Sequence, residues 1–208
     1  MIFWCKNCLN ASTRPRITFD KNGFCNACQW AEEKKTINWT KRQALLKKIF
    51  SKKKYNYDCI VPVSGGKDGS YISYMLKKKF KINPLCVTIR PPLELDLGND
   101  NLKNFINSGY DHIHITPNKN VMRDLNKLGF KHKGFPYYGW LISIFTSVLQ
   151  LAVSMNIDLI IYGEDGEVEY GGSNLTKNKP FFDALYTKKI YFEGGYEKIL
   201  KKNKAQNS

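Results

Sequence analysis

Acidic side chains are scarce in this sequence. The 208 residues include 18 Asp and Glu against 33 Lys and Arg, which gives a formal net charge of +15 at pH 7. A charge of this sign raises the local concentration of polyanions, among them nucleic acids, nucleotides, sugar acids and anionic membrane surfaces. The charge alone does not show which of these partners the protein binds. Because acidic residues are so few, a local cluster of them suggests a specific role.

Long hydrophobic runs are also missing, and so is a secretory signal. The uncharged stretch from Gly134 to Ile157 raises the question of a membrane span, which needs about 20 apolar residues. Its apolar residues recur at helical spacing, and a separate polar stripe consists of Ser143, Ser147, Gln150 and Ser154. This pattern predicts a mostly buried amphipathic helix and no membrane partner. The opening residues MIFWCKNC hold no cleavable apolar core, so we expect a cytoplasmic location.

No internal repeat is visible in the sequence. A hydrophobic content of 42% and an aromatic content of 13% suffice for a substantial core, so we expect one principal domain with a small appendage. By composition the chain divides into a Cys-rich module at residues 1–36, a basic linker helix at 37–56 and an α/β domain at 57–208.

Short apolar runs alternate with helical patterns from Tyr57 onward. Buried strands are predicted at Asp58–Val63, Leu85–Ile89 and Ile157–Tyr162, with a weaker one at His112–Thr116. Helices are predicted at Asp68–Lys79, Asn101–Ser108, Asn120–Leu128 and Tyr138–Met155, and Lys188–Gly194 offers a last strand. This alternation favours a parallel sheet with crossover helices, so the expected fold class is α/β.

The first candidate site is the loop in VPVSGGKDGSY, which runs from a predicted strand directly into a helix. Small residues here let a phosphate approach main-chain amides, and the helix presents its positive end to the same place. Lys67 adds a mobile positive charge, and Ser64 and Ser70 add hydroxyl donors. The loop is not a Walker loop, because Asp68 follows the lysine where that pattern needs Ser or Thr. The alternative is an ordinary glycine-rich turn between a strand and a helix.

Four cysteines form the second candidate site. The stretches CKNC and CNAC have the spacing of a zinc ribbon and supply Cys5, Cys8, Cys25 and Cys28. Between them, ITFDKNGF predicts a hairpin that turns at Asn22 and Gly23 and brings the second pair back to the first. Four thiolates would close a structural zinc site and leave no open position for substrate.

The third candidate site lies in IIYGEDGEVEYGGSN, where a predicted strand ends and four acidic residues follow: Glu164, Asp165, Glu167 and Glu169. Ligand sites of α/β proteins gather at the carboxyl ends of parallel strands. Mg²⁺ favours one or two carboxylates together with phosphate oxygens. We therefore predict that Glu164, Asp165 and Glu167 bind magnesium or substrate, with a solvated acidic loop as the alternative.

The loop SGGKDGS resembles the pyrophosphate loop (PP-loop), Ser-Gly-Gly-x-Asp-Ser, of the N-type ATP pyrophosphatases. The resemblance implies a Rossmann-like domain of the adenine-nucleotide alpha-hydrolase type at residues 57–208, preceded by the zinc-ribbon module. It implies that ATP and its pyrophosphate bind to Ser64, Gly65, Gly66, Lys67, Asp68, Gly69 and Ser70. Gly69 stands where the pattern carries serine, so the hydroxyl role passes to Ser70.

Further stretches resemble the N-acetyl sugar amidotransferase family: TRPRITFD, CNACQWAEEKKTINW, VPVSGGKDGSY, SGYDHIHI, KGFPYYGW and YGEDGEVEYGG. These enzymes act in bacterial lipopolysaccharide and flagellin-glycan pathways, including the pseudaminic and legionaminic acid branches. The resemblance implies conversion of an acetamido group on a sugar or nucleotide-sugar to an acetamidino group. It implies ATP and Mg²⁺ beside structural Zn²⁺, and ammonia from a separate glutaminase similar to that of histidine biosynthesis. Lys67, Asp68 and Asp165 are the catalytic residues that it implies.

Members of this family continue beyond the point where this chain ends, so we expect part of the substrate or ammonia-handling region to be missing from it, whether the chain is a fragment, a shortened paralogue or an inactive remnant. Two alternatives stay open. A tRNA thiolase also combines zinc ribbons, a pyrophosphate loop and positive charge. Such an enzyme usually needs reactive cysteines near the nucleotide or an iron-sulfur cluster, whereas Cys59 and Cys86 fall in predicted strands as buried thiols and form no Cys-x-x-Cys pair. A noncatalytic adaptor would use the zinc module and the basic helix for binding. We expect an acetamido-sugar partner rather than nucleic acid.

Overall fold

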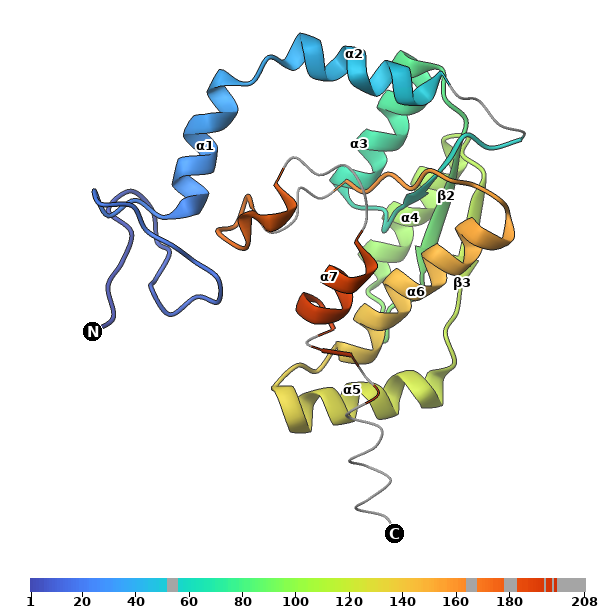
Figure 1. The fold of residues 1–208 in the computed structure, drawn as a ribbon. Coiled ribbons are helices and arrows are strands. Elements are labelled where there is room, and N and C mark those ends of the chain that lie inside the picture. Colours follow the sequence, from blue (N-terminus) through green and yellow to red (C-terminus); the bar gives the residue numbers. More distant parts are fainter. Residues whose placement is uncertain (52–55, 164–167, 178–182, 193, 196, 198–208) are drawn as a thin grey trace. The chain divides into compact units, whose positions relative to one another are not determined.

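The computed structural model describes residues 1–51, 56–163, 168–177, 183–192, 194, 195 and 197 (Figure 1). The chain forms two compact units. The cysteine unit contains Met1–Ile49 and, from the later part of the chain, the described residues 168–177. The sheet unit contains Phe50–Gly163 and the described residues from Asp183 onward. The division into 1–36, 37–56 and 57–208 stays a prediction, and the structure adds that residues 168–177 pack with the N-terminal part.

The cysteine unit is built from short turns and two helices. An antiparallel bridge between Phe19 and Cys25 closes the turn, and the Asp20 carboxylate accepts hydrogen bonds from the backbone N–H groups of Asn22 and Phe24 at 2.9 Å each. Gly23 has φ of +85°, a left-handed conformation that favours glycine. The predicted turn at Asn22 and Gly23 is therefore confirmed. Helices α1 (Asn26–Thr36) and α2 (Trp39–Phe50) follow, and the single turn η2 spans Asn174–Thr176.

Three parallel strands in the order β1-β2-β3 form the sheet: β1 (Cys59–Pro62), β2 (Pro84–Ile89) and β3 (His112–Ile115). Val61 lies opposite Cys86, and Val87 lies opposite Ile113. The predicted α/β class and these three strands are confirmed.

The predicted strand Ile157–Tyr162 is reduced to one parallel bridge. Ile160 pairs with Ile60, through hydrogen bonds from Ile60 N to Leu159 O and from Ile161 N to Ile60 O, both of 2.9 Å. This segment lies along the edge of β1 that β2 leaves open, so β1 has a parallel neighbour on each side.

Alternate residues of the strands pack on opposite faces of the sheet. Cys59, Val61 and Cys86 face α3 (Lys67–Met75), the π-helical turn η1 (Leu76–Phe80) and α4 (Asp96–Asn107). Ile60, Leu85 and Val87 face α6 (Tyr138–Ser154), whose Val148 and Ala152 are buried against them. Figure 1 shows these helices around the strands. The period-two alternation of a strand therefore buries both faces of the sheet.

Close packing of α5 (Lys119–Lys133) fixes the start of α6. A Cβ added at Gly139 would lie 2.7 Å from Met122 O and 2.8 Å from Leu125 Cβ, so only glycine allows this approach. The side-chain oxygen of Asn126 accepts from Gly139 N at 2.8 Å and from Trp140 N at 3.3 Å. These bonds satisfy N–H groups that the first turn of a helix leaves without intrahelical partners. Among the described residues, no helix is both long and apolar enough for a membrane crossing.

The predicted strand Lys188–Gly194 is wrong, because its first residues belong to helix α7 (Ala184–Ile190). The Asp183 side chain accepts from Tyr186 N at 3.0 Å and caps this helix. Tyr191 stacks on Phe145 of α6 with ring centroids 5.4 Å apart. The aromatic residues that suggested a strand are instead buried against a helix.

The predicted helix Asp68–Lys79 also differs in detail. Helix α3 ends at Met75 and continues as the π-helical turn η1, which closes at Lys81 with φ of +57°. Leu76, the first residue of this turn, and Ile82, which follows Lys81, are both buried in the core on this face of the sheet.

We expect Tyr138→Phe to lower the free energy of unfolding by about 0.5–1.5 kcal/mol, because it removes one of two hydrogen bonds to Phe192 O, which keeps its bond from Gly195 N. The Tyr138 hydroxyl donates to Phe192 O at 2.7 Å in a buried setting. Urea denaturation measures the change. The matched control is Tyr137→Phe, which alters an exposed neighbour and should stay within about 0.5 kcal/mol of the unsubstituted protein. Equal effects of the two substitutions would contradict this assignment.

Candidate functional site

The four predicted metal ligands converge in the cysteine unit. Cys25 caps the N-terminus of α1, and Cys28 lies in its first turn. The four sulfur atoms lie within 4.8 Å of one another, with 3.8 Å between Cys5 and Cys28 and 3.6 Å between Cys8 and Cys25. Ligands about 2.3 Å from a tetrahedral zinc ion stand about 3.8 Å from each other. None of the four forms a disulfide. The cluster predicted from the spacing is therefore confirmed, and its dimensions are consistent with structural zinc.

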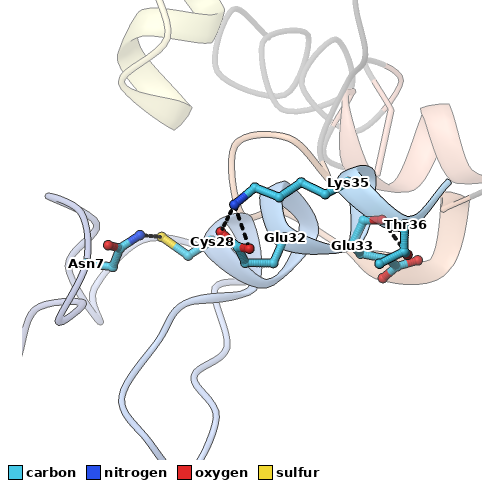
Figure 2. A network of polar contacts seen from close by, with 6 residues as sticks. All are labelled: Asn7, Cys28, Glu32, Glu33, Lys35 and Thr36. Carbon is cyan, nitrogen blue, oxygen red and sulfur yellow. Dashed lines mark hydrogen bonds and ion pairs between the residues drawn. The ribbon is translucent and has the colours of Figure 1, made fainter.

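Hydrogen-bond donors surround these sulfur atoms. Cys5 Sγ accepts from the backbone N–H of Asn7 at 3.4 Å and of Cys25 at 3.2 Å. The side-chain amide of Asn7 donates to Cys28 Sγ at 3.3 Å, as Figure 2 shows. Asn10 donates in the same way to Cys25 Sγ at 3.5 Å. Donors of this kind orient the ligands of a metal site and stabilise the thiolate form.

The pKa values of the thiols indicate that a bound cation would supply the positive charge that four ionised cysteines need. Burial raises the pKa of Cys5, but backbone N–H groups of Cys25, Asn7 and Cys8 outweigh it and bring this pKa down to about 6. Burial raises the pKa of Cys28 to about 12. Adjacent thiolates also repel one another, so a full set of four needs a compensating positive charge. Zn²⁺ supplies that charge and would be closed in by all four ligands.

The glycine-rich loop begins where β1 ends, and Val63, the residue just before the loop, is hydrogen-bonded to β2. Val63 N donates to Val87 O at 2.8 Å, and the Thr88 hydroxyl donates to Val63 O at 2.8 Å. Thr88 Oγ1 also lies 2.8 Å from His112 Nε2. Because the one hydroxyl proton is given to Val63 O, the ring nitrogen of His112 is the donor in this second bond. Burial and the nearby His114 lower the pKa of His112.

Glycines at the loop permit close backbone approaches. Gly65 has φ of +77°, and a Cβ there would lie 2.6 Å from Leu102 N of α4. A Cβ at Gly69 would lie 3.0 Å from Pro62 O. A Cβ at Gly163 would lie 3.0 Å from Asp68 C and 3.2 Å from Gly69 N. The loop and the first turn of α3 therefore pack closely against backbone of α4, of the end of β1 and of Gly163.

This arrangement coincides with a reversal of strand order. From β1 the chain proceeds to β2 and β3 on one side, whereas the later segment Leu159–Ile161 lies on the other side. The loop 64–66 and Gly163 follow the carboxyl ends of these two neighbours. In open parallel sheets such a switch point is where ligands bind.

The polar side chains of the loop differ in orientation. Lys67 Nζ contacts Asp68 Oδ1 at 2.6 Å, and the two side chains are 89% and 53% exposed. The Ser70 hydroxyl donates to Gly66 O at 2.7 Å, so it would have to rotate to donate to a ligand. Ser64 and Gly66 are exposed at the lip of the loop. The predicted loop residues are thus brought together on a solvent-facing surface.

The predicted acidic residues Glu164, Asp165 and Glu167 lie outside the described residues, so their roles stay predictions. Glu169 is described, and its carboxylate pairs with Lys34 Nζ at 2.6 Å in the cysteine unit.

Thr88 and His112 support the loop, a role that the sequence did not reveal. Thr88 belongs to no motif, whereas His112 falls within the stretch SGYDHIHI, where the alternation in HIH was the available signal. The pair acts through tertiary contacts, because Val63, Thr88 and His112 come from three separate segments.

Comparisons with known proteins assign no family to the chain. No family profile matches it. An uncharacterized protein of Methanocaldococcus jannaschii is 34% identical over 89 residues, which are 41% of this chain and 32% of that protein, so the chain spans about a third of this relative. A crystal structure described as a predicted subunit of tRNA methyltransferase, also from Methanocaldococcus jannaschii, shares 19% identity at a TM-score of 0.39. The match covers 66% of this chain and 63% of that one.

We expect the purified protein to carry about one zinc ion per chain and Cys8→Ser or Cys28→Ser to lose most of it, since each substitution opens a four-thiolate site. Metal analysis by plasma mass spectrometry checks the content. Cys59→Ala serves as the control, because Cys59 is fully buried in the sheet unit, and it should keep its zinc. Zinc content that is unchanged in both serine variants would rule out the site.

Proposed function

We propose that this chain carries the nucleotide-binding part of an ATP-dependent amidotransferase, which converts an acetamido group of a bacterial surface sugar to an acetamidino group. The observation that carries the proposal is the glycine-rich loop at residues 64–70, which leads from the carboxyl end of β1 into α3 at the point where the strand order reverses. The sequence of this loop resembles a pyrophosphate loop. Close backbone packing at Gly65, Gly69 and Gly163 fixes the shape of the loop, and amides at a helix N-terminus can receive phosphate oxygens.

The proposed chemistry overcomes the low reactivity of an amide towards ammonia. An amide carbonyl resists ammonia because its oxygen is a poor leaving group. If that oxygen attacks the α-phosphorus of ATP, pyrophosphate leaves and the amide becomes an adenylated imidate. Ammonia then adds to the imidate carbon, AMP departs, and the protonated amidine remains. Both steps depend mainly on positioning and on neutralising the charge of the leaving groups.

The residues of the loop suit the first step. Amides of residues 64–66 and the N-terminus of α3 would receive the departing pyrophosphate, and exposed Lys67 would offset its charge. Asp68, beside Lys67, would belong to the same pyrophosphate-binding set. Glu164, Asp165 and Glu167 are the predicted candidates for Mg²⁺ or substrate, and Asp165 is also a predicted catalytic residue. Mg²⁺ would lower the repulsion between carboxylates and ATP. Ammonia would come from a separate glutaminase.

The thiolase alternative receives less support from the structure. Thiolases need an ionised cysteine near the nucleotide, yet Cys59 and Cys86 are fully buried. Burial raises the pKa of Cys59 to about 12, and burial also raises the pKa of Cys86. Thiols held in this way react poorly. Tight tRNA binding with a steep salt dependence would reverse this preference.

The experiment that tests the function incubates the purified chain with ATP, Mg²⁺, ammonium and candidate acetamido-sugars. We expect AMP and pyrophosphate to form and the sugar to lose about one mass unit while gaining a positive charge, since NH replaces oxygen. Mass spectrometry of the sugar and a pyrophosphate assay provide the measurements. ATP binding without pyrophosphate release in the presence of each sugar would support the adaptor alternative instead.

We expect Gly65→Ala to weaken ATP binding by at least about tenfold, because a Cβ at positive φ costs roughly 1–2 kcal/mol and here also meets backbone. That Cβ would lie 2.6 Å from Leu102 N, so the loop or α4 must shift. Calorimetry measures the affinity, and a melting curve checks that the variant is folded.

The control for this loop variant is Gly98→Ala in α4, where a new Cβ meets nothing within 4 Å. It should bind ATP as the unsubstituted chain does. A Gly65→Ala variant with unchanged affinity would show that the nucleotide binds elsewhere.

A further inference from the structure

Residues 168–177 dock on the helix that begins at the metal centre. The Asn26 side chain, 4% exposed, donates to Gly172 O at 2.8 Å. Its carbonyl oxygen accepts from Thr18 N at 3.3 Å. One buried amide therefore joins three parts of the cysteine unit: the hairpin, α1 and a segment far along the chain.

Further contacts run along α1 away from the cysteines. Lys34 Nζ and Glu169 Oε1 are 2.6 Å apart, and Lys177 pairs with Glu33. The Lys177 ammonium also lies over the Trp30 ring, 5.0 Å from its centroid. Val168, at the start of the segment, is 6% exposed. Hydrogen bonds, ion pairs and apolar burial thus hold both ends and the middle of the segment.

The segment requires glycine where it meets Asn26. Gly171 has φ of +82°, and a Cβ there would lie 3.2 Å from Asn26 Oδ1 and 3.4 Å from Ile17 Cδ1. The close approach and the left-handed backbone together leave little room for any other residue.

Asn26 lies inside the CNAC stretch, between the metal ligands Cys25 and Cys28. A bound ion that fixes these two ligands also fixes the backbone of Asn26 and the first turn of α1. We propose that metal binding at the four cysteines and docking of residues 168–177 are coupled, with Asn26 as the joining residue. The proposal concerns this chain's own folding and does not depend on the amidotransferase chemistry.

Coupling of this kind is reciprocal. If the metal favours the docked segment, then the docked segment must favour the metal by the same factor. A change in the segment should therefore alter zinc affinity, although the segment contains none of the four cysteine ligands.

The first test measures hydrogen exchange in the full chain with zinc and after chelation. We expect the amides of residues 168–177 to exchange at least about tenfold faster without zinc, since their docking surface is released, while β2 amides stay protected. Equal exchange of the segment in both states would overturn the proposal. The readout requires no nucleotide, so it stands apart from the failure or success of the enzymatic assay.

The second test measures zinc affinity by competition with a chromogenic chelator. We expect Gly171→Ala to raise the zinc dissociation constant by roughly fivefold to tenfold, the reciprocal effect of straining the docked segment. Gly109→Ala is the matched control, since Gly109 also has positive φ but a Cβ there meets nothing within 4 Å. Its zinc affinity should not change. An unchanged dissociation constant in Gly171→Ala would show that the segment and the metal are independent.

Discussion

Hydrogen bonding of β1 along both edges governs the candidate nucleotide site. Ile60 gives its N–H and C=O groups to Leu159 and Ile161, and Val63 is tied to β2 through Val87 and Thr88. The strand is therefore held on both sides up to the residue where the glycine-rich loop begins. Because the loop is short, the same bonds determine where α3 starts and which amides face solvent. Gly163 then reaches the helix start from the opposite side.

The positive charge of the chain acts in a different way from these local contacts. Pairs such as Lys35 with Glu32 are exposed and add little stability. The 33 basic residues outnumber the 18 acidic ones, so a net charge of +15 remains and produces a positive field around the protein. Such a field would draw anions such as ATP towards the protein, whereas the loop proposed to bind them would supply directed N–H groups for phosphates. Charge and geometry thus contribute separately to the proposed site.

The cysteine unit combines local turns with contacts between distant parts of the chain. The cysteine pairs are close in sequence and can form their turns independently of the rest of the chain. The side chain of Asn26 then connects these turns to Gly172, a residue 146 positions away, through a hydrogen bond. The N-terminal part of the chain therefore holds a segment from far along the sequence through side-chain contacts, in addition to forming its own turns.

Short-range features were determined by the sequence itself. The cysteine spacing, the turn at Asn22 and Gly23, and the passage from β1 through the loop into α3 depend on neighbouring residues, so a linear pattern reveals them. Tertiary structure decided the rest. Helix α7 ends at Ile190, and Tyr191 and Phe192 just after it contact Phe145 and Tyr138 of α6 instead of forming a strand, while Ile157–Tyr162 retained one bridge. Thr88, Gly163 and Asn26 acquired their roles from atoms far away in the chain, and such contacts leave no periodic trace in the sequence.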